Sequence, residues 1–76
     1  MGVIEHAQFR PRLGKRVREL RRKPGHSQED MISFGFSARH WQQIEAGCPI
    51  TLTTLLRICE ALDVRLTTIL ARLDRN

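Results

Sequence analysis

The chain has 76 residues and a mass of 8.8 kDa, with 41% hydrophobic residues but only three phenylalanines and one tryptophan as aromatic side chains. This length is enough for one small domain only, which excludes a two-domain enzyme. A domain of this size buries only about 60% of the surface of its unfolded chain, and it leaves little room for a substrate cleft. Two cysteines exclude a disulfide-rich secreted scaffold, and the start MGVIEHAQFR lacks the apolar stretch of a signal peptide. No apolar run approaches the roughly 18 residues that cross a bilayer, so we expect a cytoplasmic protein without a membrane anchor.

The net charge of +5 is unevenly distributed along the chain. Residues 10–23 carry eight arginine and lysine side chains against a single glutamate, whereas residues 24–76 carry five basic and six acidic side chains. Positive charge concentrated in one segment indicates a polyanionic partner. Composition alone leaves open the alternative of a solvated helix face with surplus positive charge.

Glycine and proline residues divide the chain into five segments with helical patterns. Alternating patterns of β-branched residues, which would favour strands, are rare, so the fold class is predicted to be all-α. In the first segment, apolar residues recur at spacings of four, four and three, at Phe9, Leu13, Val17 and Leu20. Pro11 suits the first turn of this helix, and the proline and glycine at residues 24–25 end it.

Two short helices are predicted between residues 27 and 46, separated by Gly35. Ser27 with Asp30 three residues later is typical of a capping box, which opens a helix through about residue 34. Ser37 is expected to cap the next helix, of residues 38–46, which a glycine ends. Two alignments of this segment are possible: one places Asp30 at an interior position, and the other shortens the turn before Gly35 by one residue. We prefer the shorter turn, because burying an unpaired aspartate costs more free energy. In this register, the side chains expected inside are Met31, Ile32, Trp41 and Ile44.

Two further helices are predicted at residues 52–62 and 66–73. Residues 1–8 and 74–76 are expected to be tails, which leaves residues 9–73 as one domain. The two C-terminal helices carry more large apolar side chains than one narrow stripe requires. We therefore expect a homodimer, the alternative being that these side chains only cover the first helix. The interface residues expected are Leu56, Leu70 and Leu73.

Two short helices joined at a glycine match the requirements of a helix-turn-helix, in which the first helix braces against the DNA backbone and the second enters the major groove. The second helix carries suitable side chains, because arginine binds guanine and glutamine binds adenine through paired hydrogen bonds. Helical proteins that bind no DNA also contain such pairs, so the pattern needs support from elsewhere in the chain.

The runs LGKRVRELRRKPGHSQED, GFSARHWQQIEAG and ITLTTLLRICEALDVRLTTIL, within residues 13–70, resemble the Xre family of phage-repressor and Cro-type helix-turn-helix regulators. The resemblance implies a five-helix, lambda-repressor-like domain that binds double-stranded DNA as a homodimer on a pseudo-palindromic operator. The last run also resembles small antitoxin-type members, which implies a toxin-like protein partner as an alternative.

The resemblance also implies roles for individual residues. Bases would be contacted by Ala38, Arg39, Gln42 and Gln43. The DNA backbone would be contacted by Arg16, Ser27, Gln28, Ser37 and the backbone amides around Gly47. Arg21 and Glu45 would form a buried salt bridge between the first and third helices. Cys48 departs from the family pattern, which often has a basic phosphate contact at that position.

Other chemistries find little support in the sequence. The histidines and cysteines lack C-x-x-C and H-x-x-x-H spacing, and no nucleophile lies in a pattern with a base, so we expect no metal, no cofactor and no enzymatic activity. The predicted function is a small, nucleoid-associated transcriptional regulator that represses by occupying its operator, with activation through RNA polymerase as an alternative. A protein-interaction module of the same fold is the other candidate, and the charge of residues 10–23 favours DNA.

Overall fold

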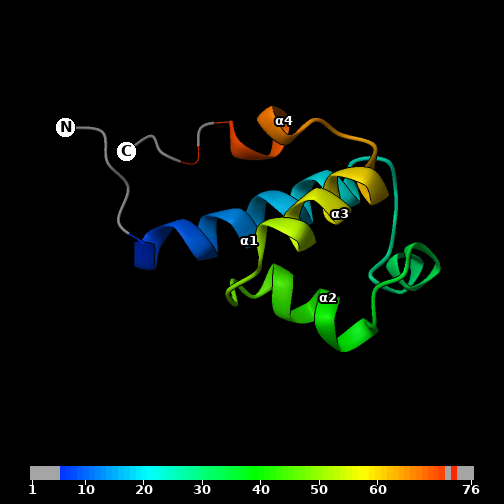
Figure 1. Cartoon of the computed structure of the whole chain (residues 1–76). Helices are drawn as coiled ribbons and strands as arrows, with labels where there is room; N and C mark the ends of the chain where they lie inside the picture. The colour runs from blue at the N-terminus through cyan, green and yellow to red at the C-terminus, as the bar shows by residue number, and fades with distance from the viewer. Residues whose placement is uncertain (1–5, 72, 74–76) are drawn as a thin grey trace.

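The computed structural model describes residues 6–71 and residue 73, and every regular element in this part of the chain is helical (Figure 1). The elements in chain order are α1 (His6–Arg22), the 3-10 helix η1 (Glu29–Phe34), α2 (Ala38–Glu45), α3 (Leu52–Leu62) and α4 (Leu66–Leu70). The prediction of an all-α fold with five helical segments is confirmed.

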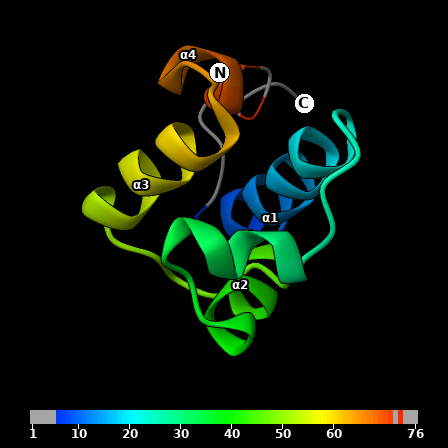
Figure 2. The same cartoon turned by 90° about the vertical axis from the view of Figure 1, so that its right-hand side faces the viewer.

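The helices are arranged so that α2 and α4 lie on opposite sides of the domain. Figure 1 and the view turned by 90° in Figure 2 both show α1 and α3 between these two helices. α1 packs against both α2 and α4, and η1 packs against α2. The η1 and α2 pair therefore forms one side of the molecule, and the C-terminal helix forms the other.

α1 is longer than the apolar pattern indicated. It begins at His6, so the prediction of a tail is wrong for residues 6–8, while residues 1–5 and 74–76 lie outside the described residues. Pro11 lies inside the helix and lacks the N–H that would bond to the carbonyl four residues earlier. Phe9, which directly follows the additional residues, packs against the core.

The core collects inward-facing side chains from all five helical elements. Trp41 of α2 is fully buried, and its ring meets the ring of Phe36 edge to face, with 5.0 Å between centroids. Ile44, one turn of helix from Trp41, is buried beside it. These contacts fix one face of α2 in the core, so the opposite face is directed to solvent.

η1 differs from the helix expected at residues 27–34. With three residues per turn it buries Met31 completely but leaves Ile32 52% exposed, so the prediction that both side chains are buried is wrong for Ile32. Phe36 is buried instead, directly after Gly35, whose φ of 94° is in the left-handed region. Asp30 remains exposed, as the predicted register requires.

Gly14 allows α1 and α2 to approach closely. A Cβ atom at this position would lie 2.6 Å from the Glu45 carbonyl oxygen and 2.8 Å from the Ile44 carbonyl oxygen. We expect Gly14→Ala to lower the free energy of unfolding by about 2 kcal/mol, because overpacking of about 3 kcal/mol outweighs the gain of about 1 kcal/mol from replacing a helical glycine. Urea denaturation measures this change, with Thr53→Ala on the exposed face of α3 as the control. A stability equal to the parent's would show that the two helices separate without cost.

Candidate nucleic-acid interface

The outer face of α2 carries the four residues expected to contact bases. All four are exposed: Ala38, Arg39, Gln42 and Gln43. Ser37 caps the helix, because its Oγ accepts a hydrogen bond of 3.0 Å from the His40 N–H. The Ser37 hydroxyl keeps its own proton for a further acceptor, such as a phosphate oxygen. α2 therefore presents hydrogen-bonding groups to solvent along one face of an eight-residue helix.

Glu45, the last residue of α2, is the centre of a buried hydrogen-bond network. Arg21 of α1 donates from Nε to Glu45 Oε2 at 2.5 Å and from Nη2 to Oε1 at 3.1 Å. The exposed fractions of the two side chains are 8% and 5%. Trp41 Nε1 also donates to Oε2, and Gln28 Nε2 donates to Oε1 at 3.1 Å. Arg21 Nη1 donates to the His26 carbonyl oxygen at 2.8 Å. The expected salt bridge is thus present and is joined to the start of η1.

The ionisation of Glu45 results from two opposing effects. Burial raises the pKa of its carboxyl group, but hydrogen bonds from Arg21, Gln28 and Trp41, together with the charge of Arg21, lower the pKa by more than burial raises it. The pKa of Glu45 therefore lies below its ordinary value of 4.5. At neutral pH the pair is an ionised carboxylate and a guanidinium, enclosed together between α1 and α2.

The start of η1 has the capping box predicted from Ser27 and Asp30. The Asp30 N–H donates to Ser27 Oγ at 3.1 Å, and the Ser27 N–H donates to Asp30 Oδ2 at 2.7 Å. This second bond lowers the pKa of Asp30 below its ordinary value of 3.8. Gln28 is half-buried and uses one amide N–H on Glu45, which leaves its other N–H for a phosphate. The same residue thus links η1 to α2.

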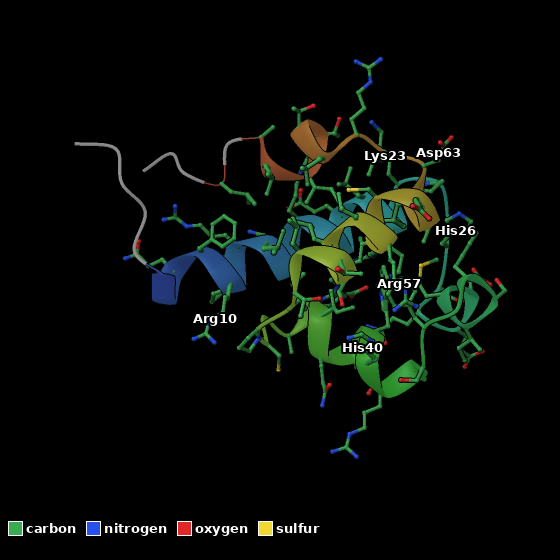
Figure 3. The ribbon with its side chains drawn as sticks, viewed as in Figure 1. Arg10, Lys23, His26, His40, Arg57 and Asp63 are labelled. Carbon is green, nitrogen blue, oxygen red and sulfur yellow. The ribbon has the colours of Figure 1, made fainter. Side chains whose placement is uncertain are left out.

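Arg57 of α3 holds the turn between η1 and α2, a role that the sequence did not reveal. Its Nη2 donates to the Gly35 carbonyl oxygen at 2.9 Å, and its guanidinium carbon lies 4.6 Å from the centre of the Phe36 ring. In Figure 3, Arg57 extends from α3 toward this turn. The contact joins residues 22 positions apart, and no local pattern around Arg57 indicates its partner.

The turn after α2 lacks the free backbone amides expected around Gly47. The Gly47 N–H donates to the Ile44 carbonyl oxygen at 3.2 Å, and the Cys48 N–H donates to the Gln43 carbonyl oxygen at 3.0 Å. Gly47 has a φ of 90°, and a Cβ atom there would lie 3.0 Å from Pro11 Cα. Glycine is required for the turn and for its close approach to α1. The predicted phosphate contact through this turn therefore has no free amide donor.

Arg16 lies on the α4 side of α1 and not beside α2. Its Nε and Nη2 donate to the Thr68 carbonyl oxygen at 3.3 and 3.1 Å. This side chain therefore joins α1 to α4, and its position gives no support to the predicted contact of Arg16 with a DNA phosphate. Arg12 Nη1 donates on the same side to the Leu73 carbonyl oxygen at 3.4 Å, beside a pocket of about 480 Å³ that Lys15 also lines.

The three leucines expected at a dimer interface have different environments. Leu56 on α3 is 44% exposed, Leu70 is half-buried against the core, and Leu73 is only 5% exposed. α4 ends at Leu70 instead of residue 73, and the extended backbone of Ala71 follows it. Leu73 is therefore not on a continued helical face but packs in the core of the monomer, which corrects its assignment to an interface.

The histidine, cysteine and acidic side chains do not form a cluster of three or more suited to a metal ion within the described residues. Cys48 is exposed after α2, whereas Cys59 is buried in α3, where burial raises the pKa of its thiol. Among the described helices, none combines the length and apolar character needed to span a membrane.

No protein-family model and no curated protein matches the chain. Among solved structures, its fold is similar to that of the restriction-modification controller protein C.AhdI from Aeromonas hydrophila, with a TM-score of 0.74. The two sequences are 29% identical, and the match covers 84% of this chain and 98% of the controller protein. The chain therefore shares its all-helical fold with a controller protein over nearly the whole length of that protein.

Proposed function

We propose that this chain is a transcriptional regulator that binds a specific double-stranded DNA operator and represses by occupying it. α2 enters the major groove, where exposed arginine and glutamine side chains contact base edges. The observation that carries this proposal is the exposed outer face of α2, combined with the buried Glu45 network that holds the helix rigidly against α1.

The likeness to a restriction-modification controller protein supports a regulatory role. The shared fold extends over 84% of this chain and 98% of the controller protein. Regulation through the concentration of the protein and its assembly on DNA is the simplest mechanism for such a chain.

Backbone contacts in this proposal come from the two ends of the helix-turn-helix. Ser37 offers its hydroxyl proton at the start of α2, and Gln28 offers its second amide N–H at the start of η1. Ser27, exposed beside Gln28, completes this group. Such contacts fix the orientation of α2 in the groove, while the base contacts of α2 select the sequence.

The proposal is tested by an electrophoretic mobility shift with short duplex DNA at low salt, followed by selection of bound fragments from a random pool. Each neutralised phosphate contributes about 0.9 to the slope of log affinity against log salt. A dimer that makes about six to ten phosphate contacts should lose about three to five decades of affinity between about 50 and 200 mM salt. Absence of binding at low salt would refute the proposal and favour a protein-interaction module.

The proposed regulator is a homodimer whose interface includes Leu56 and Leu70. Leu52, one helical turn before Leu56, is 66% exposed, so α3 has an apolar strip that the monomer leaves in solvent. A two-fold axis there would present two copies of α2 to one face of DNA, about 34 to 36 Å apart. The operator should accordingly contain two half-sites one helical turn apart.

We expect Leu56→Glu to convert the dimer into a monomer without unfolding it, because the side chain is already 44% exposed. Sedimentation equilibrium at micromolar concentration measures the assembly, and a thermal melt measures the fold. Gln8→Glu, at an exposed position of α1, is the control for the added charge. Leu73→Glu should instead unfold the monomer, because Leu73 is in the core. A parent protein that stays monomeric even on DNA would contradict the dimer.

A further inference from the structure

The end of α2 lacks an evident group for binding a phosphate. The amides of Gly47 and Cys48 are used in closing the helix, and Cys48 has no positive charge. Yet this turn lies at the C-terminal end of α2, one helical turn after Gln43 of the exposed face, so DNA bound as proposed along α2 would pass close to it. A cation contributed by another element would supply the missing contact.

Arg10 of α1 lies beside this turn. A Cβ atom on Gly47 would lie 3.3 Å from the Arg10 carbonyl carbon, so the backbone of the turn touches α1 at this residue. Figure 3 shows Arg10 projecting from the N-terminal half of α1 toward the side on which α2 lies, away from α4. Arg12 and Arg16, in contrast, donate to carbonyl oxygens on the α4 side.

The guanidinium of Arg10 has no protein partner among the described residues. Its Nε is buried without a hydrogen-bond partner, and none of the ion pairs within residues 6–71 and residue 73 includes it. The residue is also in the second turn of α1, whose first turn has no acidic side chain, so the positive end of the helix dipole lies nearby. Both features favour an anion at this position, and neither is satisfied within the chain.

We propose that Arg10 binds a DNA phosphate beside the Gly47 turn, where the backbone amides are already hydrogen-bonded within the chain. This proposal rests on the proposed function, because the anion is the backbone of the duplex that α2 contacts. Arg10 then marks one edge of the contact surface, and the start of η1 marks the other. In this arrangement α1 contributes one cation to the contact surface, whereas Arg16 bonds to α4 and Arg12 bonds to Leu73 beyond the end of that helix.

The test compares Arg10→Ala with Lys15→Ala, which removes the same charge from the α4 side of the same helix. Binding to poly(dI-dC) is measured by fluorescence anisotropy over a series of salt concentrations, since phosphate contacts do not depend on sequence. Arg10→Ala should reduce the slope of log affinity against log salt by about 0.9 for each bound copy of the chain, and Lys15→Ala should leave it unchanged. Arg10→Lys should keep the slope, because the lysine ammonium also binds phosphate.

Circular dichroism melts of the variants show whether the fold is intact, and Arg10→Gln provides a second variant of similar length should the alanine protein be unstable. A slope equal to the parent's in a folded Arg10 variant, or equal losses for Arg10 and Lys15, would overturn the proposal. Either result leaves DNA binding by the parent intact. Failure of the parent to bind poly(dI-dC) at low salt would instead refute the proposed function itself.

Discussion

Replacing Glu45 with alanine is expected to lower the free energy of unfolding by about 3 to 5 kcal/mol, because the change leaves a buried guanidinium without its counter-charge. Arg21 would keep only its bond to the His26 carbonyl oxygen. The amide of Gln28 and the indole N–H of Trp41 would also lose their acceptor. A domain of this size has about 4 to 11 kcal/mol of stability, so the loss is a large fraction of the total.

Urea denaturation of Glu45→Ala and of the parent measures this loss, and Glu19→Ala is the matched control. Glu19 is also a glutamate that faces an arginine, at 3.6 Å from Arg16, but its side chain is 54% exposed. Exposed ion pairs contribute only about 0 to 1 kcal/mol, so the control should change little. Replacing Glu45 and Arg21 together with apolar side chains should cost much less than removing Glu45 alone. Equal losses for the Glu45 and Glu19 variants would show that the network is not buried in solution.

The pH dependence of this loss follows from the lowered pKa of Glu45. A carboxyl group with a lower pKa in the folded protein contributes fully to stability above its ordinary pKa, here 4.5, and loses this contribution as the pH falls through the folded value. The difference in stability between the parent and Glu45→Ala should therefore be largest above pH 4.5 and decrease in more acidic solution. Urea titrations at neutral pH and in acid measure both values.

Local patterns predicted those features of the fold that depend on neighbouring residues. The capping bonds of Ser27 and Ser37 and the inward position of Trp41 follow from short spacings in the sequence, and the structure has all three. The pairing of Arg21 with Glu45 came from the family resemblance. The capping bonds and the position of Trp41 require only that a helix forms at a particular place, whereas the Arg21–Glu45 pair joins residues 24 positions apart and has no local signal.

Features that depend on distant parts of the chain were not predicted. Arg16 is exposed in any helical pattern, and only the position of α4 shows that it donates to the Thr68 carbonyl oxygen. Leu73 was assigned to a continued helix, whereas the end of α4 at Leu70 turns it into the core. The 3-10 geometry of η1 similarly exposes Ile32, which an α-helical period would bury. Sequence periodicity contains no information about where a helix ends against its neighbours.

The proposed base-contacting face of α2 depends on both kinds of information. Its four base contacts were implied by the family resemblance, but the rigid presentation of the face comes from Glu45 and Arg57, whose contacts reach α1 and the turn before α2. A helix held at both ends by hydrogen bonds loses little further freedom on binding. Specificity should therefore be concentrated in the few side chains that extend from it.

Alanine substitution of Arg39 is expected to weaken binding to the true operator by about 1 to 3 kcal/mol per half-site, and so by about 2 to 6 kcal/mol for a dimer on two half-sites. Binding to random duplex DNA should change little, because an arginine that bonds a guanine edge contributes mainly where that guanine is present. Gln42→Ala and Gln43→Ala should show the same contrast. Arg39→Lys should not restore specificity, because an ammonium cannot form the paired bonds of a guanidinium.

Competition binding with the selected operator and a scrambled duplex measures this ratio at fixed salt, and Arg65→Ala is the matched control. Arg65 is an exposed arginine at the start of α4, on the side of the domain opposite α2, so it loses the same charge without touching the groove. An Arg39 variant that weakens both duplexes equally would mean that Arg39 contacts only phosphate. In that case specificity would belong to the two glutamines, whose amides favour adenine, and the preferred operator should lack a guanine requirement at the corresponding position.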